Sequence, residues 1–393
     1  MYSNLDLLSG TRSGVGNTSS FLEHRLLLNP EVVVDDRFSI RTSINLLQMG
    51  SSADSGNSVP ENFGAPLDHR QSFGSGGGLT TSLQEAYLEW ASDWGIFRFG
   101  RMPKSWGLGI VHFTGTDPLL DFHTVVDRVG YQALLGNLGL NIAYEKGAES
   151  TINSDWDDMD TFELSLDYSN PESLLDVGLL YTRNVRLAGA GSLLNSSHDL
   201  SIFGRKRMQR FQIGGEFATI GQDRRANQVG MLGELDWMPG DFSWGADLAY
   251  ATSSSEGSFV FNPSYQPFLI LFRQSVGTGV ATNSVRGGAE GSSAFGGATN
   301  GSGGGGLLLK TRLAYAFYSK RYILGSDFGW AKLINQGAAS SPTLGTEFDL
   351  HLTQKWYDNF KTFYALGMLF PSKAFGESPQ VAWGLQIRGA LTF

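Results

Sequence analysis

The chain ends in the stretch VAWGLQIRGALTF, residues 381–393, in which every second residue from Val381 to Phe393 is apolar or glycine. The residues between them are small or polar, among them Gln386 and Arg388. Successive side chains of a β-strand point to opposite faces of its sheet. This period of two therefore predicts a strand with one apolar face and one polar face.

The same alternation recurs along the chain. In Thr161–Tyr168 the even-numbered residues are Phe, Leu, Leu and Tyr, whereas the odd-numbered ones include Glu163 and Asp167. A soluble β-sandwich also alternates, but its outward face carries more charge. Aromatic-rich apolar positions that alternate with polar ones are typical of a membrane β-barrel, in which lipid-facing and lumen-facing residues alternate. Further segments with this period are Arg37–Leu46, Arg210–Phe217, Met231–Trp237, Phe242–Tyr250 and Phe348–Lys355.

The composition favours the same fold class. Of 393 residues, 51 are glycine, 12% are aromatic and only 17% are charged, against roughly a quarter charged in a typical soluble domain. Yet mean hydropathy is −0.14, and no stretch approaches the ~20 apolar residues of a membrane-spanning helix. The absence of cysteine excludes disulfides and thiolate metal sites. The net charge of −9 argues against nucleic acid as a partner.

Connections between the predicted strands alternate between short and long. The short ones contain residues suited to tight turns, such as Gly136-Asn137 and Pro239-Gly240-Asp241. Outer-membrane barrels have short periplasmic turns and longer external loops. The predicted external loops are residues 48–78, 102–126, 186–197 and 253–305.

This alternation also allows the strands to be counted backwards from the C-terminus. It predicts one all-β antiparallel transmembrane barrel over residues 1–393, with 18 strands if residues 2–9 and 198–203 are strands. Sixteen strands is the alternative, with the N-terminal segment as a plug. An even number is expected for bacterial single-chain barrels.

A barrel of this kind is expected in the bacterial outer membrane. Its partners are then outer-membrane lipid and the barrel-assembly machinery, and the terminal Phe393 resembles the assembly signal that this machinery reads. The start, Met1-Tyr2-Ser3-Asn4, has neither the basic nor the apolar region of a signal peptide, so we expect that a signal peptide has been removed.

Charged residues on the polar face of the predicted strands are candidates for lining the lumen. Both signs occur, so opposite charges can pair across the lumen and brace the wall, or the charges can produce a field that favours hydrated polar solutes. The two roles are compatible. The candidate lumen-lining residues are Arg41, Arg98, Glu163, Asp167, Arg210, Glu216, Arg312 and Arg388.

The most apolar run of the chain, Phe259–Arg273, lies inside the predicted external loop 253–305. An apolar run of this size marks an interaction surface or is tucked away. We favour a lid or plug that folds into the barrel mouth; contact with lipid or with a second copy of the protein is the alternative. The residues expected to form the plug or interaction surface are Phe259, Phe261, Tyr265, Phe268, Phe272 and Arg273.

No segment has the pattern of a reaction centre. The glycine-rich residues 283–306 lack the strand, helix and lysine of a phosphate-binding loop. The six histidines form no metal-ligand pattern, and no Ser/His arrangement stands out. We therefore expect no enzyme activity, no cofactor and no bound metal.

The stretch Arg98–Ile110, after Glu85–Trp90 and a short turn, resembles porin-like barrels of the alginate-export kind. It is more similar to an outer-membrane family of predatory and fruiting-body-forming proteobacteria, as are Val126–Val129, Phe259–Gly277 and Leu369–Phe375. The resemblance extends from about residue 80 to the end, and the chain looks like a major outer-membrane protein of a predatory bacterium. It implies a barrel of 16–18 strands and a porin-like role. Unlike alginate exporters, the chain lacks a strongly basic predicted lumen.

Two main functions follow as hypotheses, with a lipid hydrolase at the barrel rim as a minor third. The first is a passive channel for small hydrophilic solutes, because a barrel of this size leaves an aqueous lumen unless loops fill it. The alternative is a plugged, non-conducting structural protein that forms homo-oligomers and organises or encloses lipid. Its basis is the apolar external run together with the aromatic outer wall.

Overall fold

The computed structural model describes residues 2–9, 18–49, 67–68, 79–114, 122–148, 159–186, 195–222, 225–254, 257–262, 265, 267–271, 305–335, 341–375 and 380–392. Apart from the 3-10 turn η1 (Lys373–Phe375), all elements are β-strands. No helix in these ranges has the length and apolar character needed to cross a membrane. Phe393, the predicted assembly signal, lies outside the described residues.

One antiparallel sheet dominates the described residues. Because β2, β3 and β4 are consecutive pieces of one interrupted strand, the sheet has 18 strands, the number favoured from the sequence. Its strands are β1 (Tyr2–Ser9), β2 (Thr18–Arg25), β3 (Leu27–Leu28), β4 (Glu31–Asp35), β5 (Phe38–Met49), β7 (Leu79–Ser92), β8 (Gly95–Pro103), β10 (Val125–Leu135), β11 (Leu138–Ala148), β12 (Met159–Asn170), β13 (Leu175–Arg186), β14 (Asn195–Arg207), β15 (Phe211–Gln222), β16 (Arg225–Trp237), β17 (Phe242–Ala251), β20 (Gly306–Phe317), β21 (Tyr322–Lys332), β22 (Thr343–Tyr357), β23 (Phe360–Pro371) and β24 (Ala382–Leu391).

Four further short strands form two separate pairs. β6 (Leu67–Asp68) pairs with β9 (Phe122–His123), and β18 (Ser253–Ser254) pairs with β19 (Gly257–Ser258). All four lie in connections that the sequence predicts to be long.

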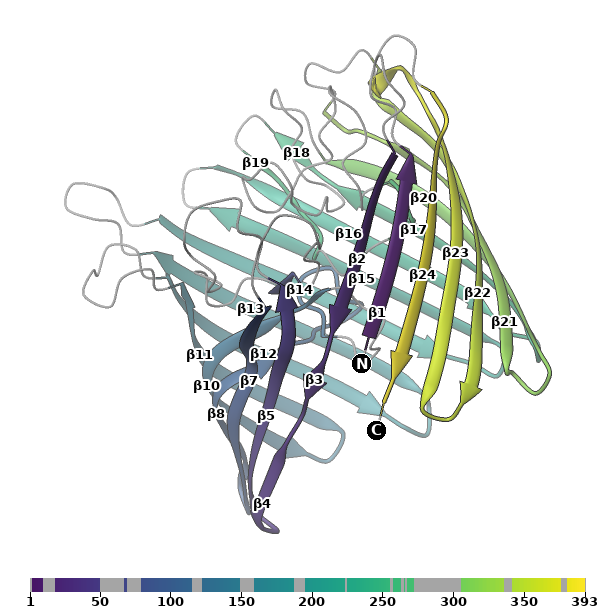
Figure 1. Ribbon diagram of the computed structural model, residues 1–393. Coiled ribbons are helices and arrows are strands. Elements are labelled where there is room, and N and C mark those ends of the chain that lie inside the picture. Colours follow the sequence, from purple (N-terminus) through teal and green to yellow (C-terminus); the bar gives the residue numbers. More distant parts are fainter. Residues whose placement is uncertain are drawn as a thin grey trace. The chain divides into compact units, whose positions relative to one another are not determined.

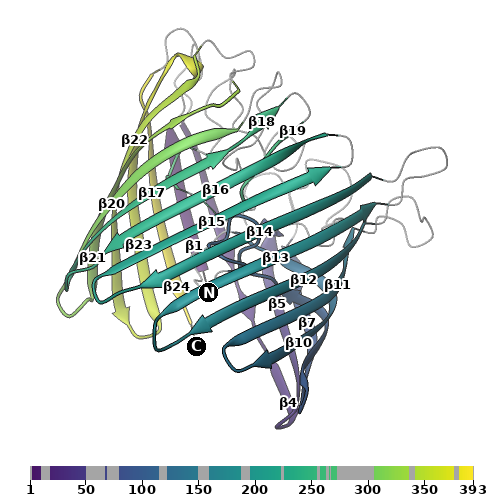
Figure 2. The same cartoon turned by 180° about the vertical axis from the view of Figure 1, so that it is seen from behind.

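The chain divides into two compact units. The central unit comprises residues 23–204 and 218–227. Its strands from β7 to β13 pair with their neighbours along the chain, as Figure 2 shows for β10 to β13. The turn between β10 and β11 is Gly136-Asn137, as predicted, and Gly136 has a φ of 64°, a conformation that glycine adopts without strain.

The terminal unit comprises residues 1–22, 205–217 and 228–393, and so contains both ends of the chain. Here β1 pairs with β24, from Tyr2 opposite Ala390 to Ser9 opposite Trp383 (Figure 1). β17 pairs directly with β20, with Ala251 opposite Gly306, although residues 252–305 lie between them in the sequence. The chain then continues as antiparallel neighbours from β20 to β24.

Three predicted strands begin one residue too early: β5, β15 and β24 begin at Phe38, Phe211 and Ala382 rather than at Arg37, Arg210 and Val381. The sequence predicts a strand over Arg210–Phe217, with Arg210 lining the lumen, but β15 begins at Phe211. Arg210 is an exposed residue of the turn after β14, where the Met208 N–H donates a hydrogen bond to the Phe211 carbonyl. Arg210 is therefore a turn residue at the end of the strand, and its lumen-lining role stays a prediction.

The strands have two distinct faces. In β12, Phe162, Leu164 and Leu166 are all exposed, whereas Glu163 and Ser165 between them are buried. We call these the apolar face and the polar face of the sheet. A water-soluble protein buries its apolar face, so the reversed pattern indicates a wall whose outside meets hydrocarbon.

This facing assignment predicts the effect of a charge in β12. Leu164→Arg should lower the free energy of unfolding by about 2–4 kcal/mol, the cost of a cation at the bilayer midplane. Urea unfolding of the protein in lipid vesicles measures this change. Leu174→Arg is the matched control, because Leu174 is as exposed as Leu164, 44%, but lies in the turn between β12 and β13. Equal losses in the two variants would contradict the assignment.

Candidate functional site

The apolar run of the sequence packs against the polar face of the terminal unit. We call residues 259–271 the plug segment; the structure describes 259–262, 265 and 267–271 of it. Among these, Phe259 and Phe261 are each 1% exposed, and Phe268 is also buried. Phe272 and Arg273 lie outside the described residues. The sequence left three placements for this run: in the barrel mouth, against lipid, or against a second copy. The described part lies on the polar face of the sheet.

Two carboxylates of β22 hold the backbone of the plug segment. Glu347 accepts the N–H groups of Ile270 and Leu271, one on each oxygen, both at 2.7 Å. Asp349 accepts the N–H of Leu269 at 3.0 Å. Both side chains are buried, so little water competes with these backbone donors for their oxygens. Three consecutive backbone donors are therefore fixed by two neighbouring side chains on one face of one strand.

Lys310 of β20 adds a third anchor. Its Nζ donates to the Pro267 carbonyl at 2.5 Å and lies 5.5 Å from the centroid of the Phe268 ring. It also forms an ion pair with Asp327 of β21 at 3.0 Å. The lysine thus connects the plug segment to the strands beneath it through a hydrogen bond and a cation–π contact.

Glycines in the wall form the seats of the plug segment. A Cβ on Gly230 would lie 2.1 Å from the Phe259 ring, and one on Gly329 would lie 2.3 Å from the Phe268 ring. A Cβ on Gly367 would be 3.0 Å from Leu269. The segment can therefore lie flush against the sheet only because these wall positions have no side chain. Glycines at polar-face positions of the strands were the feature of the sequence that could have indicated where the plug segment packs.

A second segment packs on the polar face of the central unit, directly after β8. The Trp106 ring donates to the Ser201 hydroxyl at 3.0 Å and meets Phe203 edge-on, with ring centroids 5.0 Å apart. Both rings cover Gly178, where a Cβ would be 2.4 Å from Phe203. Ile110 further along has no exposed surface. We call residues 104–113 the inner loop.

Four charged groups hold the start of the inner loop. The Lys104 ammonium lies 2.9 Å from Glu145 and 2.5 Å from Glu163. Arg128 lies 3.4 Å from each of the same two carboxylates. All four side chains are at most 17% exposed. Because each buried charge has partners of opposite sign, removing any one would leave an uncompensated charge.

His112 of the inner loop is half-buried and lies near two cations. Burial lowers the pKa of His112 well below 6.5, and the positive charges of Lys104 and Arg128 lower it further. The imidazole is therefore neutral when the loop is docked. Its backbone carbonyl accepts the N–H of Trp106 at 3.0 Å, which folds the loop back on itself.

A cavity of about 390 Å³ lies beside the inner loop, within the central unit. Its lining includes Arg98, Gln132, Asn141 and Asp167 from four strands, together with Trp106. Arg98 donates to Glu89 at 2.6 Å and to Gln132 at 3.0 Å. The cavity is thus a mostly polar space in which the side chains are already connected to one another.

The structure places seven of the eight predicted lumen-lining residues in strands. Arg41, Arg98, Glu163 and Asp167 belong to the central unit, and Glu216, Arg312 and Arg388 to the terminal unit. Their ion pairs run along the wall: Arg98 contacts Glu89 of the adjacent strand, and Arg312 lies 2.8 Å from Asp247 of its neighbour β17. These pairs join neighbouring strands along the wall, whereas the sequence predicts pairing across the lumen, which stays a prediction.

Sequence reasoning missed the residues that anchor the two segments, namely Lys104, Glu145, Lys310, Glu347 and Asp349. Glu347 and Asp349 flank the first residue of the predicted strand Phe348–Lys355, so their shared polar face was visible. Their partners are backbone N–H groups nearly eighty positions away in the chain. No local pattern carries that information.

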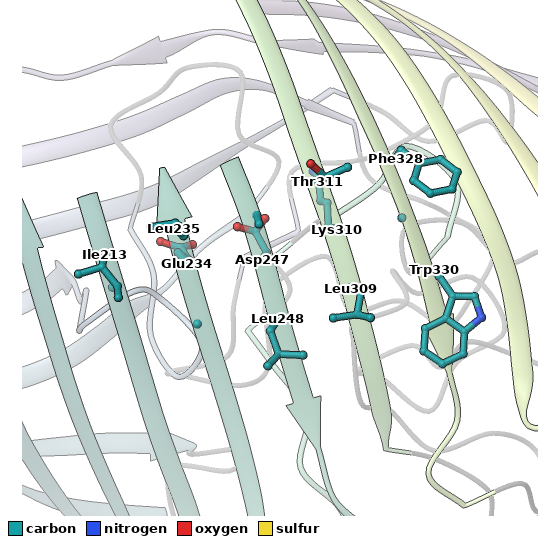
Figure 3. Close-up of a pocket in the computed structure, with 14 residues that line it drawn as sticks. Ile213, Glu234, Leu235, Asp247, Leu248, Leu309, Lys310, Thr311, Phe328 and Trp330 are labelled. Atoms are coloured by element: carbon teal, nitrogen blue, oxygen red, sulfur yellow. The ribbon is translucent and has the colours of Figure 1, made fainter. Parts of the chain in front are cut away.

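The apolar face has a cavity of its own in the terminal unit, a groove of about 590 Å³ (Figure 3). Leu248, Leu309 and Trp330 occupy facing positions on β17, β20 and β21 at its edge. The Thr311 hydroxyl in its lining bonds the Gly245 carbonyl at 3.2 Å and accepts the indole N–H of Trp244 at 3.0 Å. The groove is therefore a surface for apolar contact.

Comparisons with known proteins agree on the architecture. The structure matches OccK5 (OpdH) of Pseudomonas aeruginosa with a TM-score of 0.58 at 9% identity, covering 100% of this chain and 97% of that one. It matches OccK10 (OpdN) of the same organism with a TM-score of 0.56, again at 9% identity and with coverage of 100% and 97%. The fold is that of an outer-membrane β-barrel.

Both matched proteins are outer-membrane porins. At this level of identity the likeness concerns the fold. No protein-family model matches the sequence, and no curated protein matches it. The predicted membership of a family of predatory and fruiting-body-forming bacteria, and the resemblance to alginate-export porins, stay predictions.

The carboxylate anchor of the plug segment leads to a labelling prediction. Glu347→Gln replaces one acceptor oxygen by a donor, so one backbone N–H loses its partner at a cost of about 1–3 kcal/mol. A cysteine introduced by Ile270→Cys should then react with a maleimide about 5–150-fold faster, as that energy implies. The chain has no native cysteine to interfere. Glu172→Gln, in the exposed β12–β13 turn, should leave the rate unchanged; equal rates in all three proteins would exclude the anchor.

The inner loop should respond to acid. The pKa of His112 is lowered in the docked loop, so the released loop has the higher affinity for the proton. Protonation below about pH 6.5 therefore stabilises the released loop. The docked state is therefore favoured above that pH and is weakened as the pH falls below it. His112→Gln removes this dependence. Amide hydrogen exchange over residues 104–113, compared between wild type and variant at pH 7.5 and at pH 5, measures it. Wild type should exchange faster than the variant only at pH 5.

Proposed function

We propose that the chain is a channel of the bacterial outer membrane through which small hydrophilic solutes diffuse passively. The observation that carries the proposal is the separation of the two faces. One face exposes aromatic and aliphatic side chains, and the other holds ion-paired charges such as the half-buried Arg98 and the buried Glu163. In a barrel the polar face surrounds the lumen. Eighteen strands enclose an aqueous space unless loops fill it.

The plug segment and the inner loop set the width of this channel. Each packs on the polar face of its own unit, and each is fixed by buried charged side chains. Removing either segment should therefore widen the path without altering the strands. Solutes are sorted by size and by the charges that line the remaining space.

The apolar face and the chain terminus complete the proposal. The exposed aromatic and aliphatic side chains contact outer-membrane lipid, and Phe393 is read by the barrel-assembly machinery during insertion. We also propose that the protein forms homo-oligomers through part of this face. Large exposed apolar patches mark surfaces that contact other proteins or a membrane, and this face exposes many large apolar side chains.

Single-channel conductance in a planar bilayer tests the channel. The intact protein should give steady open steps, and a variant with residues 253–305 replaced by a short Gly-Ser linker should give larger steps. The matched control removes only residues 276–300, which retains the plug segment and should conduct like the intact protein.

Each other outcome has a definite meaning. Silence from the intact protein, with steps only after removal of residues 253–305, would replace the open channel by a barrel closed by its own loop. A structural or gated role would then be the better account. Silence from all three proteins, each shown to be folded by its heat-dependent gel mobility, would overturn the channel itself.

A further inference from the structure

The cavity beside the inner loop has an unequal charge balance. Its cations are all engaged with carboxylates: Arg98 with Glu89, and both Lys104 and Arg128 with Glu145 and Glu163. Asp167 also lines the cavity, but it forms no ion pair within the described part of the chain. The lining itself holds three cations and two carboxylates, but the cations also pair with Glu89 and Glu145 beside it. Three cations thus face four carboxylates, so the uncompensated charge is negative.

Asp167 is held in a fixed position. It lies opposite Gly139 of β11, and a Cβ on that glycine would be 2.6 and 2.7 Å from its two carboxylate oxygens. The carboxylate thus lies flat across the neighbouring strand. Its Oδ1 accepts a hydrogen bond from the Asn141 amide at 3.2 Å, and the same amide reaches the Ser165 hydroxyl at 3.2 Å. An anion placed in this way needs no rearrangement to receive a cation.

The lining beside Asp167 is suited to a small polar group. Gln132, Asn141 and Ser165 supply amide and hydroxyl groups, and a volume of about 390 Å³ is in the range of small-molecule pockets. A partly enclosed carboxylate attracts a cation more strongly than one in bulk water, because less solvent screens the pair. Asp167 repels an incoming carboxylate. The nearby guanidinium and ammonium groups do not offset this repulsion, because they are already paired with carboxylates of the protein.

We infer that this cavity is a binding site for small solutes that carry a protonated amine. The ammonium group pairs with Asp167, and hydroxyl or amide groups of the solute meet Asn141, Ser165 and Gln132. The inference rests on the proposed channel, for which it names a solute class, and it sets this channel apart from one that selects carboxylates.

Three probes of matched size test the inference: ethanolamine, which is a cation at neutral pH, glycolate, which is an anion, and neutral ethylene glycol. Saturation-transfer NMR on the detergent-solubilised full chain measures binding without requiring conduction. Ethanolamine should bind at least tenfold more tightly than glycolate, with ethylene glycol between them.

Variants assign the preference to one carboxylate. Asp167→Asn keeps the size and removes the charge, and should weaken ethanolamine binding at least tenfold. Asp167→Glu keeps the charge and should retain the order of the three probes. Asp176→Asn is the matched control, because Asp176 lies at the exposed start of β13, where it accepts the Ser169 hydroxyl; it should bind like wild type.

The outcomes separate this inference from the channel proposal. Equal binding of ethanolamine and glycolate, or an Asp167→Asn variant that binds ethanolamine like wild type, overturns the amine site even if the protein conducts. Unaltered NMR preferences in a protein that never conducts support the site and overturn the channel. In a conducting protein, added ethanolamine should reduce the potassium current, and Asp167→Asn should abolish that reduction.

Discussion

The rest of the structure depends on one constraint, which is that every strand must satisfy two solvents at once. Inside a hydrocarbon layer each backbone N–H and C=O must find a partner within the protein, and a sheet provides these partners between strands. The side chains then divide by parity, as Phe162 and Glu163 do in β12. Once the backbone is paired in this way, a single residue of register decides which face a charge occupies.

The polar face meets a second constraint: its charged side chains lie close together and are partly shielded from water, so each needs a partner of opposite charge. Neighbouring strands bring opposite charges together, as with Arg312 beside Asp236 and Asp247. Glycines leave room for what packs above, as Gly329 does for Phe268. The backbone of the plug segment enters the same network through Glu347, so an apolar segment is held by carboxylates. Burial of its aromatic rings contributes roughly 1.5–3 kcal/mol each.

The sequence allowed the fold class, the favoured strand number and the first strand, residues 2–9, to be predicted, because parity is a local property that each strand repeats. It placed most candidate lining residues in strands for the same reason, whereas Arg210 lies in the turn one residue before β15. The anchors of the plug segment and the Lys104 cluster were not predictable. They join positions far apart in the chain. The local sequence around a charged strand residue is the same whether its side chain contacts solvent, another charge or a backbone N–H.

The pairing of β1 with β24 has a consequence for how the protein forms. Residues 2–9 and 383–390 are far apart in the sequence, so this seam is the least local contact among the described strands and forms only when both segments are present. Until then both edges expose unpaired backbone, which invites association with other chains. The same adjacency also means that the two ends can be joined and the chain opened at another turn, giving a permuted protein with the seam in its middle.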